Sequence, residues 1–364
     1  QRQMCIRDRQ ISMYYLILQH PGHNRVYFNS ADKLALAELK LASRRLSSYP
    51  KEEPNVVLIE DIRYLAIETQ GELIESDLEI ISRLSFVFAL FKSKKREDIS
   101  CLIPLKKKPY LSLEEKISSI LKYQGKTNEL FTKMMINVAL LSSDFGYSDN
   151  IKLLDPIAGK GTTIFEGAVS GFDVYGIEIE PKSVHESIIF FKKFLEEDRF
   201  KHISGKRQIY GTTKAEAIWI SEFEYAKTKE LFKSKTPNKK LGMICGKSQD
   251  AFKYFKKKHF NLLVGDLPYG VFHGNTTGKI NEARTRDPSR LLNKSIEDWY
   301  QVLKFGGVAV IAFNAFVASK DKISKIFTQK GFKIMTDIPF TEFEHRVDQS
   351  IKRDIIVAKK ENNN

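Results

Sequence analysis

The spacing of apolar residues changes near residue 150 and divides the chain into two differently patterned parts. Before that point, stretches of alternating apolar and polar residues are interspersed with apolar residues at helical spacing. From Ile151 onward, short apolar runs follow one another at intervals that leave room for a helix between each pair. Regular strand–helix alternation is typical of a doubly wound sheet, so the second part is predicted to be α/β.

The first part, residues 13–105, is predicted to be a small α+β domain with a ferredoxin-like order of elements. The predicted elements are a strand at 14–19, a helix at 30–46, strand-rich sequence at 55–69 that can hold a hairpin, a helix at 76–91 and a strand at 101–105. Residues 106–150 are expected to form linker helices, one beginning at a capping-box sequence at 112–115 and a second covering 128–142.

The second part, residues 151–360, predicts a Rossmann-like domain with a seven-stranded sheet. Its strands are predicted at 152–156, 173–179, 242–245, 261–265, 307–313, 332–341 and 354–358, with helices at 162–170, 181–196, 249–257, 296–304 and 319–329. Residues 211–231 fit neither pattern. In such a sheet, ligands bind at the carboxyl ends of the strands, so the residues that follow the strands are the candidates for chemistry.

Charge and composition indicate a cytoplasmic protein whose partner is a polyanion. Fifty-nine Lys and Arg residues against 45 Asp and Glu residues leave a net charge of +14, as in many nucleic-acid-binding proteins. The three cysteines lie far apart with no CxxC pair, so neither a disulfide framework nor a metal site is expected. No apolar stretch reaches the roughly 18 residues that a transmembrane helix needs, and no membrane partner is expected.

Residues 1–12 stand apart from both patterned parts. They have no periodicity, and Met13 directly precedes the first strand pattern. We therefore expect this leader to be non-native sequence.

The first chemical motif follows the strand predicted at 152–156. That strand leads into Asp155, and the next turn carries Gly159 and Gly161 before a predicted helix. Glycines let a backbone approach a ligand closely, and a helix N-terminus offers unpaired N–H groups. Ile164 stands where a dinucleotide motif requires its third glycine, which leaves a nucleoside-binding turn or a plain tight turn.

The second motif is an acid at the end of the next predicted strand. Glu178 follows Gly161 at about the interval at which Rossmann-like domains place the carboxylate that binds ribose hydroxyls. A carboxylate can accept hydrogen bonds from both hydroxyls of a cis-diol. Taken alone, Glu178 could equally be a solvated residue at a strand end.

The third motif is Asp266-Leu267-Pro268-Tyr269-Gly270, which ends the strand predicted at 261–265. It matches the Asp/Asn-Pro-Pro-Tyr type of sequence that binds planar nitrogen substrates, with Leu in the second place. Asp266 and a neighbouring backbone carbonyl can accept both N–H bonds of an exocyclic amine, and Pro268 stiffens the turn that holds these acceptors. Tyr269 offers a face for base stacking. The competing interpretation is an ordinary Asp-x-Pro turn.

Together, the three motifs resemble those of the tRNA guanine-N2 methyltransferases related to the THUMP-containing, guanosine-10 type. The likeness covers roughly residues 127–360 and implies a Rossmann-like catalytic domain, S-adenosylmethionine as methyl donor, and tRNA or another structured RNA as substrate. It implies catalytic roles for Asp266, Pro268 and Tyr269, and cofactor contacts from Asp155, Pro156, Ala158, Gly159, Gly161, Thr162, Glu178, Asp250 and Asp266. Ile157, Ala158 and Lys160 depart from the usual residues of this loop, and the N-terminal part is shorter than a complete THUMP domain with its usual companion.

Two basic runs are predicted to contact nucleic-acid phosphates, although any one run could be a solvated surface. Their residues are Lys94, Lys95, Arg96, Lys106, Lys107 and Lys108. His345, beside Arg346, could line the site or belong to a polar turn.

The sequence thus predicts an S-adenosylmethionine-dependent N-methyltransferase acting on guanine N2 in tRNA. Two alternatives remain. A DNA methyltransferase acting on adenine N6 or cytosine N4 would use the same motif, and a catalytically idle RNA-binding adaptor could retain a vestigial cofactor loop.

Overall fold

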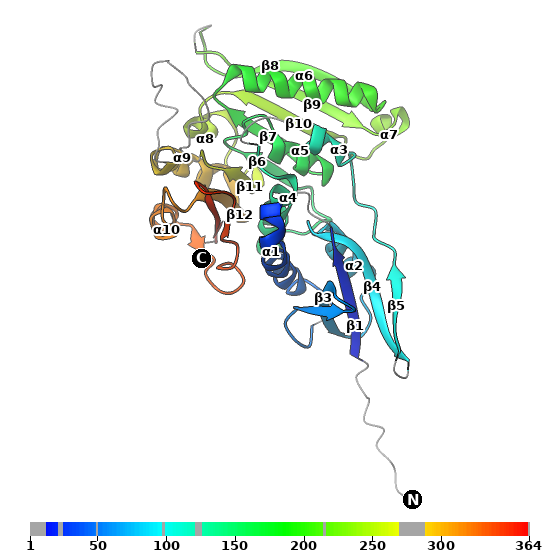
Figure 1. Ribbon diagram of the computed structural model, residues 1–364. Helices are drawn as coiled ribbons and strands as arrows, with labels where there is room; N and C mark the ends of the chain where they lie inside the picture. The colour runs from blue at the N-terminus through cyan, green and yellow to red at the C-terminus, as the bar shows by residue number, and fades with distance from the viewer. Residues whose placement is uncertain are drawn as a thin grey trace, which may run out of the picture. The chain divides into compact units, whose positions relative to one another are not determined.

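The computed structural model describes residues 12–20, 25–48, 50–96, 99–120, 126–213, 216–268 and 288–362. The chain divides into two compact units, Gln1–Tyr110 and Leu111–Asn364 (Figure 1). Within the described ranges, no helix is both long enough and apolar enough to cross a membrane.

The first unit is a five-stranded antiparallel sheet with two helices. Its elements are β1 (Ser12–Gln19), α1 (Arg25–Ser43), β2 (Asn55–Ile59), β3 (Ile62–Gln70), α2 (Glu75–Arg83), β4 (Val87–Arg96) and β5 (Ile99–Leu105). The strand order is β2-β3-β1-β4-β5, so each helix carries the chain past one intervening strand. This is the connectivity of a split βαβ arrangement, with β5 added at one edge.

The helix predicted at 76–91 is wrong in its second half. Helix α2 ends at Arg83, Leu84 takes extended backbone angles, and β4 begins at Val87. An amphipathic helix and an apolar, aromatic-rich strand follow each other here without a glycine or proline between them. The pattern therefore gave no sign of the boundary, and tertiary pairing of β4 with β1 and β5 decides it.

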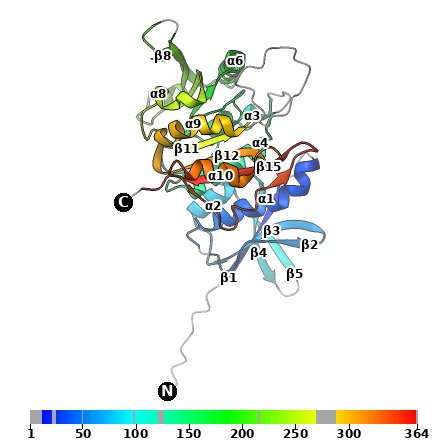
Figure 2. The same cartoon turned by 90° about the vertical axis from the view of Figure 1, so that its left-hand side faces the viewer.

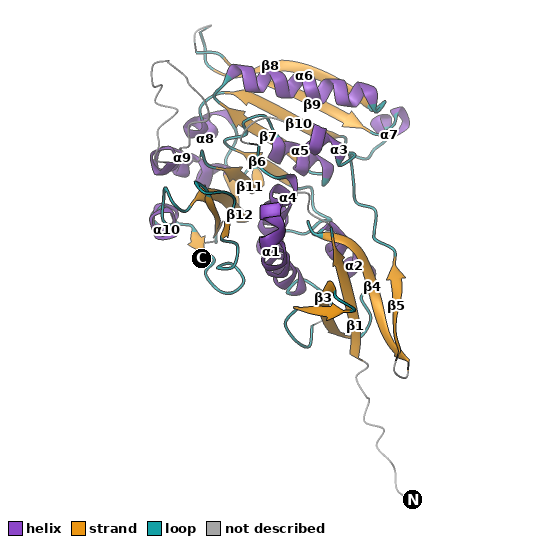
Figure 3. Cartoon of the chain, in the orientation of Figure 1, coloured by secondary structure: helices purple, strands orange, loops and turns teal. Residues whose placement is uncertain are grey.

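The second unit is built on a ten-stranded mixed sheet (Figure 3). Its strands are β6 (Lys152–Asp155), β7 (Asp173–Glu178), β8 (Lys201–Tyr210), β9 (Ile218–Ala226), β10 (Lys239–Cys245), β11 (Phe260–Asp266), β12 (Leu303–Asn314), β13 (Lys333–Ile334), β14 (His345–Arg346) and β15 (Lys352–Lys359). They run in the order β13-β15-β12-β11-β6-β7-β10-β9-β8, and β14 pairs with β15. The strands from β12 to β10 in this order are parallel, whereas β15 and β9 are antiparallel to their neighbours.

The predicted count of seven strands is therefore too low. The β8–β9 hairpin extends the sheet beyond β10, and β14 adds a short strand beside β15. Most side chains of β8 are exposed and polar, so this strand lacks the apolar pattern from which strands are predicted. The strand predicted at 332–341 shrinks to the two residues of β13.

Helices cover both faces of this sheet (Figure 2). Helices α3 (Lys116–Ile120), α4 (Glu129–Ser142), α5 (Thr162–Val169) and α6 (Pro181–Glu197) lie on one side, and α8 (Ala251–Tyr254), α9 (Pro288–Val302) and α10 (Lys320–Thr328) lie on the other. The short helix α7 (Lys229–Lys233) follows β9, and the 3-10 turn η1 (Ser248–Asp250) precedes α8. The helix predicted at 249–257 is thus replaced by η1 and a single turn of α8.

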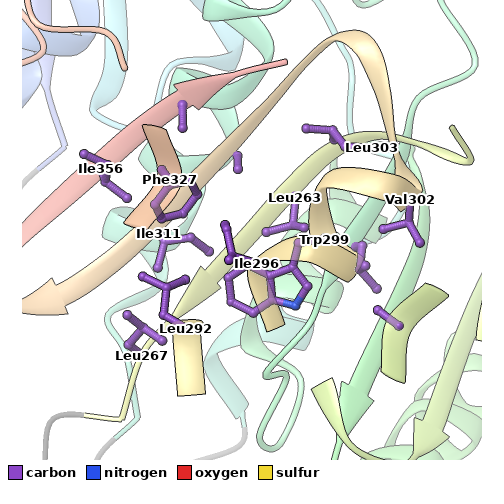
Figure 4. Packing of buried hydrophobic residues seen from close by; sticks show 14 of the residues in the cluster. Leu263, Leu267, Leu292, Ile296, Trp299, Val302, Leu303, Ile311, Phe327 and Ile356 are labelled. Carbon is purple, nitrogen blue, oxygen red and sulfur yellow. The ribbon is translucent and has the colours of Figure 1, made fainter. Parts of the chain in front are cut away.

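The core between α9 and the sheet fixes the strands that carry the site (Figure 4). Leu292, Ile296 and Trp299 repeat at helical spacing, so they share the face of α9 that is buried against β11 and β12. The Trp299 indole N–H donates to the Ser248 hydroxyl over 3.1 Å, which ties α9 to η1. Burial of each such apolar side chain contributes about 1.5–3 kcal/mol.

The order of the parallel strands reverses between β6 and β11. From β6, the sheet continues through β7 and β10 in one direction, and β11 and β12 lie in the other. In open α/β sheets, the loops that leave the two strands at this point diverge and leave a crevice at their carboxyl ends. Asp155 and Asp266 end these two strands.

Candidate functional site

The turn after β6 is shaped by two glycines with left-handed backbone. Gly159 has φ +52° and Gly161 has φ +93°, a region that side chains with Cβ rarely adopt. Gly161 also precedes the first turn of α5, whose N–H groups face the crevice end of the sheet. A Cβ built on Gly159 would meet no atom within 4 Å, so the backbone of this turn borders open space into which a ligand can approach.

Asp155 is a buried acid at the centre of this turn. It is only 2% exposed, and its Oδ1 accepts the backbone N–H of Ile157 over 3.0 Å, while the Thr163 hydroxyl also donates to it. Burial raises the pKa of Asp155 to about 7, and the nearby carboxylates of Glu178 and Asp266 add to the rise. A cationic group placed beside Asp155 would favour its ionised form.

Glu178 links the ends of β6 and β7. One of its oxygens accepts the backbone N–H of Gly159 and the other accepts that of Glu180, both over 2.8 Å. Each carboxylate oxygen has a second lone pair, so Glu178 keeps the capacity to bind a pair of hydroxyls. The structure therefore brings Asp155, Gly159 and Glu178 together, as the motifs predicted.

A pocket of about 500 Å³ opens at the carboxyl ends of β7 and β10. Its lining comprises Ile179, Tyr210, Glu216, Ile218, Cys245, Gly246, Lys247, Asp250, Lys253 and Tyr254. A Cβ on Gly246 would lie 2.7 Å from the Tyr254 hydroxyl, so a residue without a side chain is needed for Tyr254 to take this position. The volume is in the range of small-molecule sites.

Asp250, the acid predicted beside the cofactor, is one of the charged residues of this pocket. Its Oδ1 accepts from the Lys253 ammonium over 2.6 Å. The Lys253 ammonium also lies 5.8 Å from the centre of the Tyr210 ring. The pocket thus offers acceptor oxygens, a cation and aromatic faces side by side.

Of the ten residues that line this pocket, only Asp250 was predicted from the sequence; Ile179, Tyr210 and Ile218 are among the nine that were missed. The sequence carried a signal for Ile179, because this apolar residue directly follows the strand-end acid Glu178; in the structure it is 49% exposed. Tyr210 and Ile218 belong to the β8–β9 hairpin, whose register shifts between Gln208 and Tyr210. Such bulges redirect side chains, and nothing in the sequence pattern indicated this one.

Asp266 ends β11 and is held by residues from distant parts of the chain. The Thr127 hydroxyl donates to its Oδ2 over 2.7 Å, and an Nη of Arg353 lies 3.9 Å from the same oxygen. The backbone N–H of Leu267 donates to the carbonyl of Ala312 over 2.9 Å, which keeps the chain after Asp266 aligned with β12. Pro268 is exposed, and the predicted role of Tyr269 falls outside the described residues.

His345 contacts residues that surround this acid, and neither of its two interpretations is decided by these contacts. It is buried, its Nδ1 lies 2.9 Å from the carbonyl of Phe343, and its ring centre lies 5.1 Å from that of Phe131. His345 also pairs with Arg353 across β14 and β15. Arg346 is exposed.

The residues predicted to bind nucleic acid lie in the first unit, with differing surroundings. Lys94 and Lys106 are exposed, and the Lys107 ammonium donates to the carbonyl of Val87 over 3.3 Å. Lys108 pairs with Glu75 and lowers the pKa of that carboxyl. The side chains of Lys95 and Arg96 are outside the described part. In the ranges that the structure covers, no group of three or more His, Cys, Asp or Glu side chains could hold a metal ion.

Comparison with known proteins yields only distant structural likenesses. No family model matches the chain, and no curated protein matches it. Among solved structures, a TehB-like SAM-dependent methyltransferase from Corynebacterium glutamicum is 14% identical, with 58% of this chain and 81% of that chain covered and a TM-score of 0.33. An rRNA methylase from Streptococcus thermophilus is 12% identical, covering 66% of this chain and 100% of that chain at a TM-score of 0.35. The 16S rRNA N2 G1207 methyltransferase of T. thermophilus is 14% identical, covering 84% of this chain and 58% of that chain at a TM-score of 0.36. TM-scores this low assign the chain to no family.

Proposed function

We propose that this chain is an S-adenosylmethionine-dependent N-methyltransferase acting on an exocyclic amine of a nucleic-acid base, with guanine N2 in tRNA as the substrate that its motifs favour. The observation that carries the proposal is the meeting of three strand-end carboxylates, Asp155, Glu178 and Asp266, at the point where the strand order reverses. Each carboxylate ends a different strand and accepts hydrogen bonds from different donors.

This group of acids favours a cationic ligand over a phosphate-bearing one. Burial and the two neighbouring carboxylates raise the pKa of Asp155, so its ionised form would be stabilised by a positive charge placed beside it. An amino acid ammonium or a sulfonium would supply that charge. The phosphates of NAD or ATP would meet repulsion from the same three acids.

The residues around the crevice fit the parts of S-adenosylmethionine. Asp155 and the Gly159–Gly161 turn would hold the amino acid moiety, and Glu178 would accept hydrogen bonds from the ribose diol. The pocket beside Asp250, with apolar Ile179, would take the adenine ring. The chemistry that the cofactor supplies when bound is a methyl group on a positively charged sulfur.

Asp266 would act on the target amine. Its carboxylate accepts an N–H of the amine, and a backbone carbonyl of Leu267 or Pro268 accepts the second, so the lone pair of the nitrogen is directed away from the ring plane. Tyr269 would stack on the base, which has to leave its own stack first at a cost of a few kcal/mol. Fixed acceptors of this kind typically change rates by a factor of about 10²–10³.

A polyanionic substrate is consistent with the charge of the chain. The excess of 59 basic over 45 acidic residues predicts that binding to RNA weakens steeply as salt rises. Replacing exposed Lys94 and Lys106 together with Ala is expected to flatten this dependence by about two charges.

The test is methylation of natural nucleic acids. Purified protein is incubated with isotope-labelled S-adenosylmethionine and, separately, with total tRNA, ribosomal RNA or genomic DNA, followed by mass spectrometry of the nucleosides. Labelled N2-methylguanosine from tRNA is the expected product, and it should disappear with D266A. Label in N6-methyladenine or N4-methylcytosine from DNA would identify the DNA enzyme instead. Tight RNA binding without label in any pool would identify an idle adaptor.

A further inference from the structure

A cluster of residues far apart in the sequence surrounds Asp266. Thr127 precedes α4, Phe131 lies in its first turn, and Arg353 comes from β15. The Arg353 guanidinium lies 4.7 Å from the centre of the Phe131 ring, a cation–π arrangement, while one of its Nη atoms is 3.9 Å from Asp266.

The start of α4 fixes the position of Thr127. The Asn128 side chain caps the helix by accepting the backbone N–H of Phe131 over 3.1 Å, and Phe131 is completely buried. The helix cap and the buried ring therefore anchor the chain directly after the residue whose hydroxyl donates to Asp266.

Arg353 is anchored as firmly. It is 5% exposed, lies in the long pairing of β15 with β12, and faces His345 across β14. Burying a guanidinium is costly unless it is paired, and a planar guanidinium stacked on a ring has little freedom to move. The charge of the buried Arg353 is paired with the strand-end acid Asp266, and the Phe131 ring restricts the orientation of its guanidinium.

The hydrogen bond from Thr127 and the ion pair with Arg353 both involve the same oxygen of Asp266. The hydroxyl is hydrogen-bonded to Oδ2 and the guanidinium charge attracts the same oxygen, so together they favour one rotation of the carboxylate about its bond to the chain. We propose that Thr127 and Arg353 are positioning residues, which orient the Asp266 carboxylate toward the amine of the target base. This inference rests on the proposed function, because it assigns these residues a role in that reaction.

The experiment compares single-turnover rates at saturating cofactor and tRNA. T127V removes the hydroxyl with little change in shape, and T127S keeps it. Loss of a hydrogen bond to a charged group predicts a rate about 10- to 100-fold lower for T127V, with recovery in T127S. R353K keeps the charge but loses the planar fork, so a similar loss is expected. The affinity for S-adenosylhomocysteine should stay unchanged in all three.

A matched control separates positioning from folding. T132V removes the hydroxyl of a nearby threonine inside α4, one that donates to the backbone carbonyl of Asn128 over 3.1 Å, and it should leave the rate unchanged. In the double variant T127V/R353K, the losses should combine to less than their product, because both residues act through one oxygen. If T127V lowers the melting temperature more than T132V does, its rate loss reflects a weakened fold. The rate of R353K then decides between positioning and folding.

The outcomes distinguish this inference from the function on which it rests. A slow T127V that T127S restores, with unchanged cofactor affinity, supports it. Wild-type rates in T127V and R353K, or rate losses matched by equal losses of cofactor affinity, would overturn it while leaving the methyltransferase assignment intact. A wild-type protein that labels no nucleic acid would overturn both.

Discussion

Asp155 should make cofactor binding depend on pH. Burial, with help from Glu178 and Asp266, raises the pKa of Asp155 to about 7, whereas its ordinary value is 3.8. The ammonium of the cofactor needs the ionised carboxylate, so binding should release one proton below the raised pKa. For a single linked proton, affinity at about pH 5.5 should be roughly 30-fold weaker than at about pH 8.

The assay is titration calorimetry with S-adenosylhomocysteine, a stable analogue that keeps the ammonium. Runs across about pH 5.5–8 in two buffers of different ionisation enthalpy give both the affinity and the number of protons released. D155N should bind more weakly at high pH and show no dependence on pH. E166Q is the matched control, since burial also raises the pKa of Glu166 to about 7 but its side chain bonds to Ser118 on α3, away from the turn. Affinity that stays flat in the wild-type protein, or a slope that persists in D155N, would refute the assignment of Asp155 to the ammonium.

The same carboxyl affects the stability of the ligand-free protein in the opposite direction. A carboxyl whose pKa is raised on folding stabilises the fold fully below its ordinary pKa, and this stabilisation is lost as pH rises through the raised value. Asp155 and Glu166 therefore both predict that the melting temperature falls between about pH 4 and pH 7. D155N and E166Q should each make that fall shallower.

Three further predictions concern single side chains. Y210A should weaken S-adenosylhomocysteine binding about tenfold by calorimetry, through lost stacking, while Y210F and the hairpin control W219A bind normally; equal binding by Y210A would place the nucleoside elsewhere. G161A should lower the free energy of unfolding in urea by about 1–2 kcal/mol, since its φ of +93° disfavours a Cβ; an unchanged midpoint would contradict this. W299A should cost about 3–5 kcal/mol in the same assay, and S248A only about 1 kcal/mol; equal losses would mean that the hydrogen bond outweighs core packing.

The parts of the site that follow buried parallel strands could be predicted from the sequence. Strands β6, β7 and β11 are apolar runs that end in an acid, and parallel strands place such ends along one edge of a sheet. The acids Asp155 and Glu178, which interact with the same glycine turn, could therefore be paired before any coordinates were known.

The rest of the site depends on contacts that no local pattern records. Thr127 and Asp266 are separated by 139 positions, and Arg353 reaches the same oxygen from the last long strand. The β8–β9 hairpin also escaped prediction, because an edge strand with mostly exposed side chains needs no apolar alternation. The register of this hairpin shifts between Gln208 and Tyr210, and Tyr210 lines the pocket.

The charges of this chain act over two different distances. A net charge of +14 produces a long-range field that attracts a polyanion, although salt screens it beyond about 10 Å. The carboxylates at the reversal point act over a short range: burial is the main cause of the raised pKa of Asp155, and the charges of Glu178 and Asp266 add to it. A basic chain can therefore collect an RNA over its surface and still present an acidic crevice to a cationic cofactor and to the N–H groups of a base. Such a separation is what a methyl transfer from a sulfonium to a nucleic-acid amine requires, because its two substrates carry opposite charges.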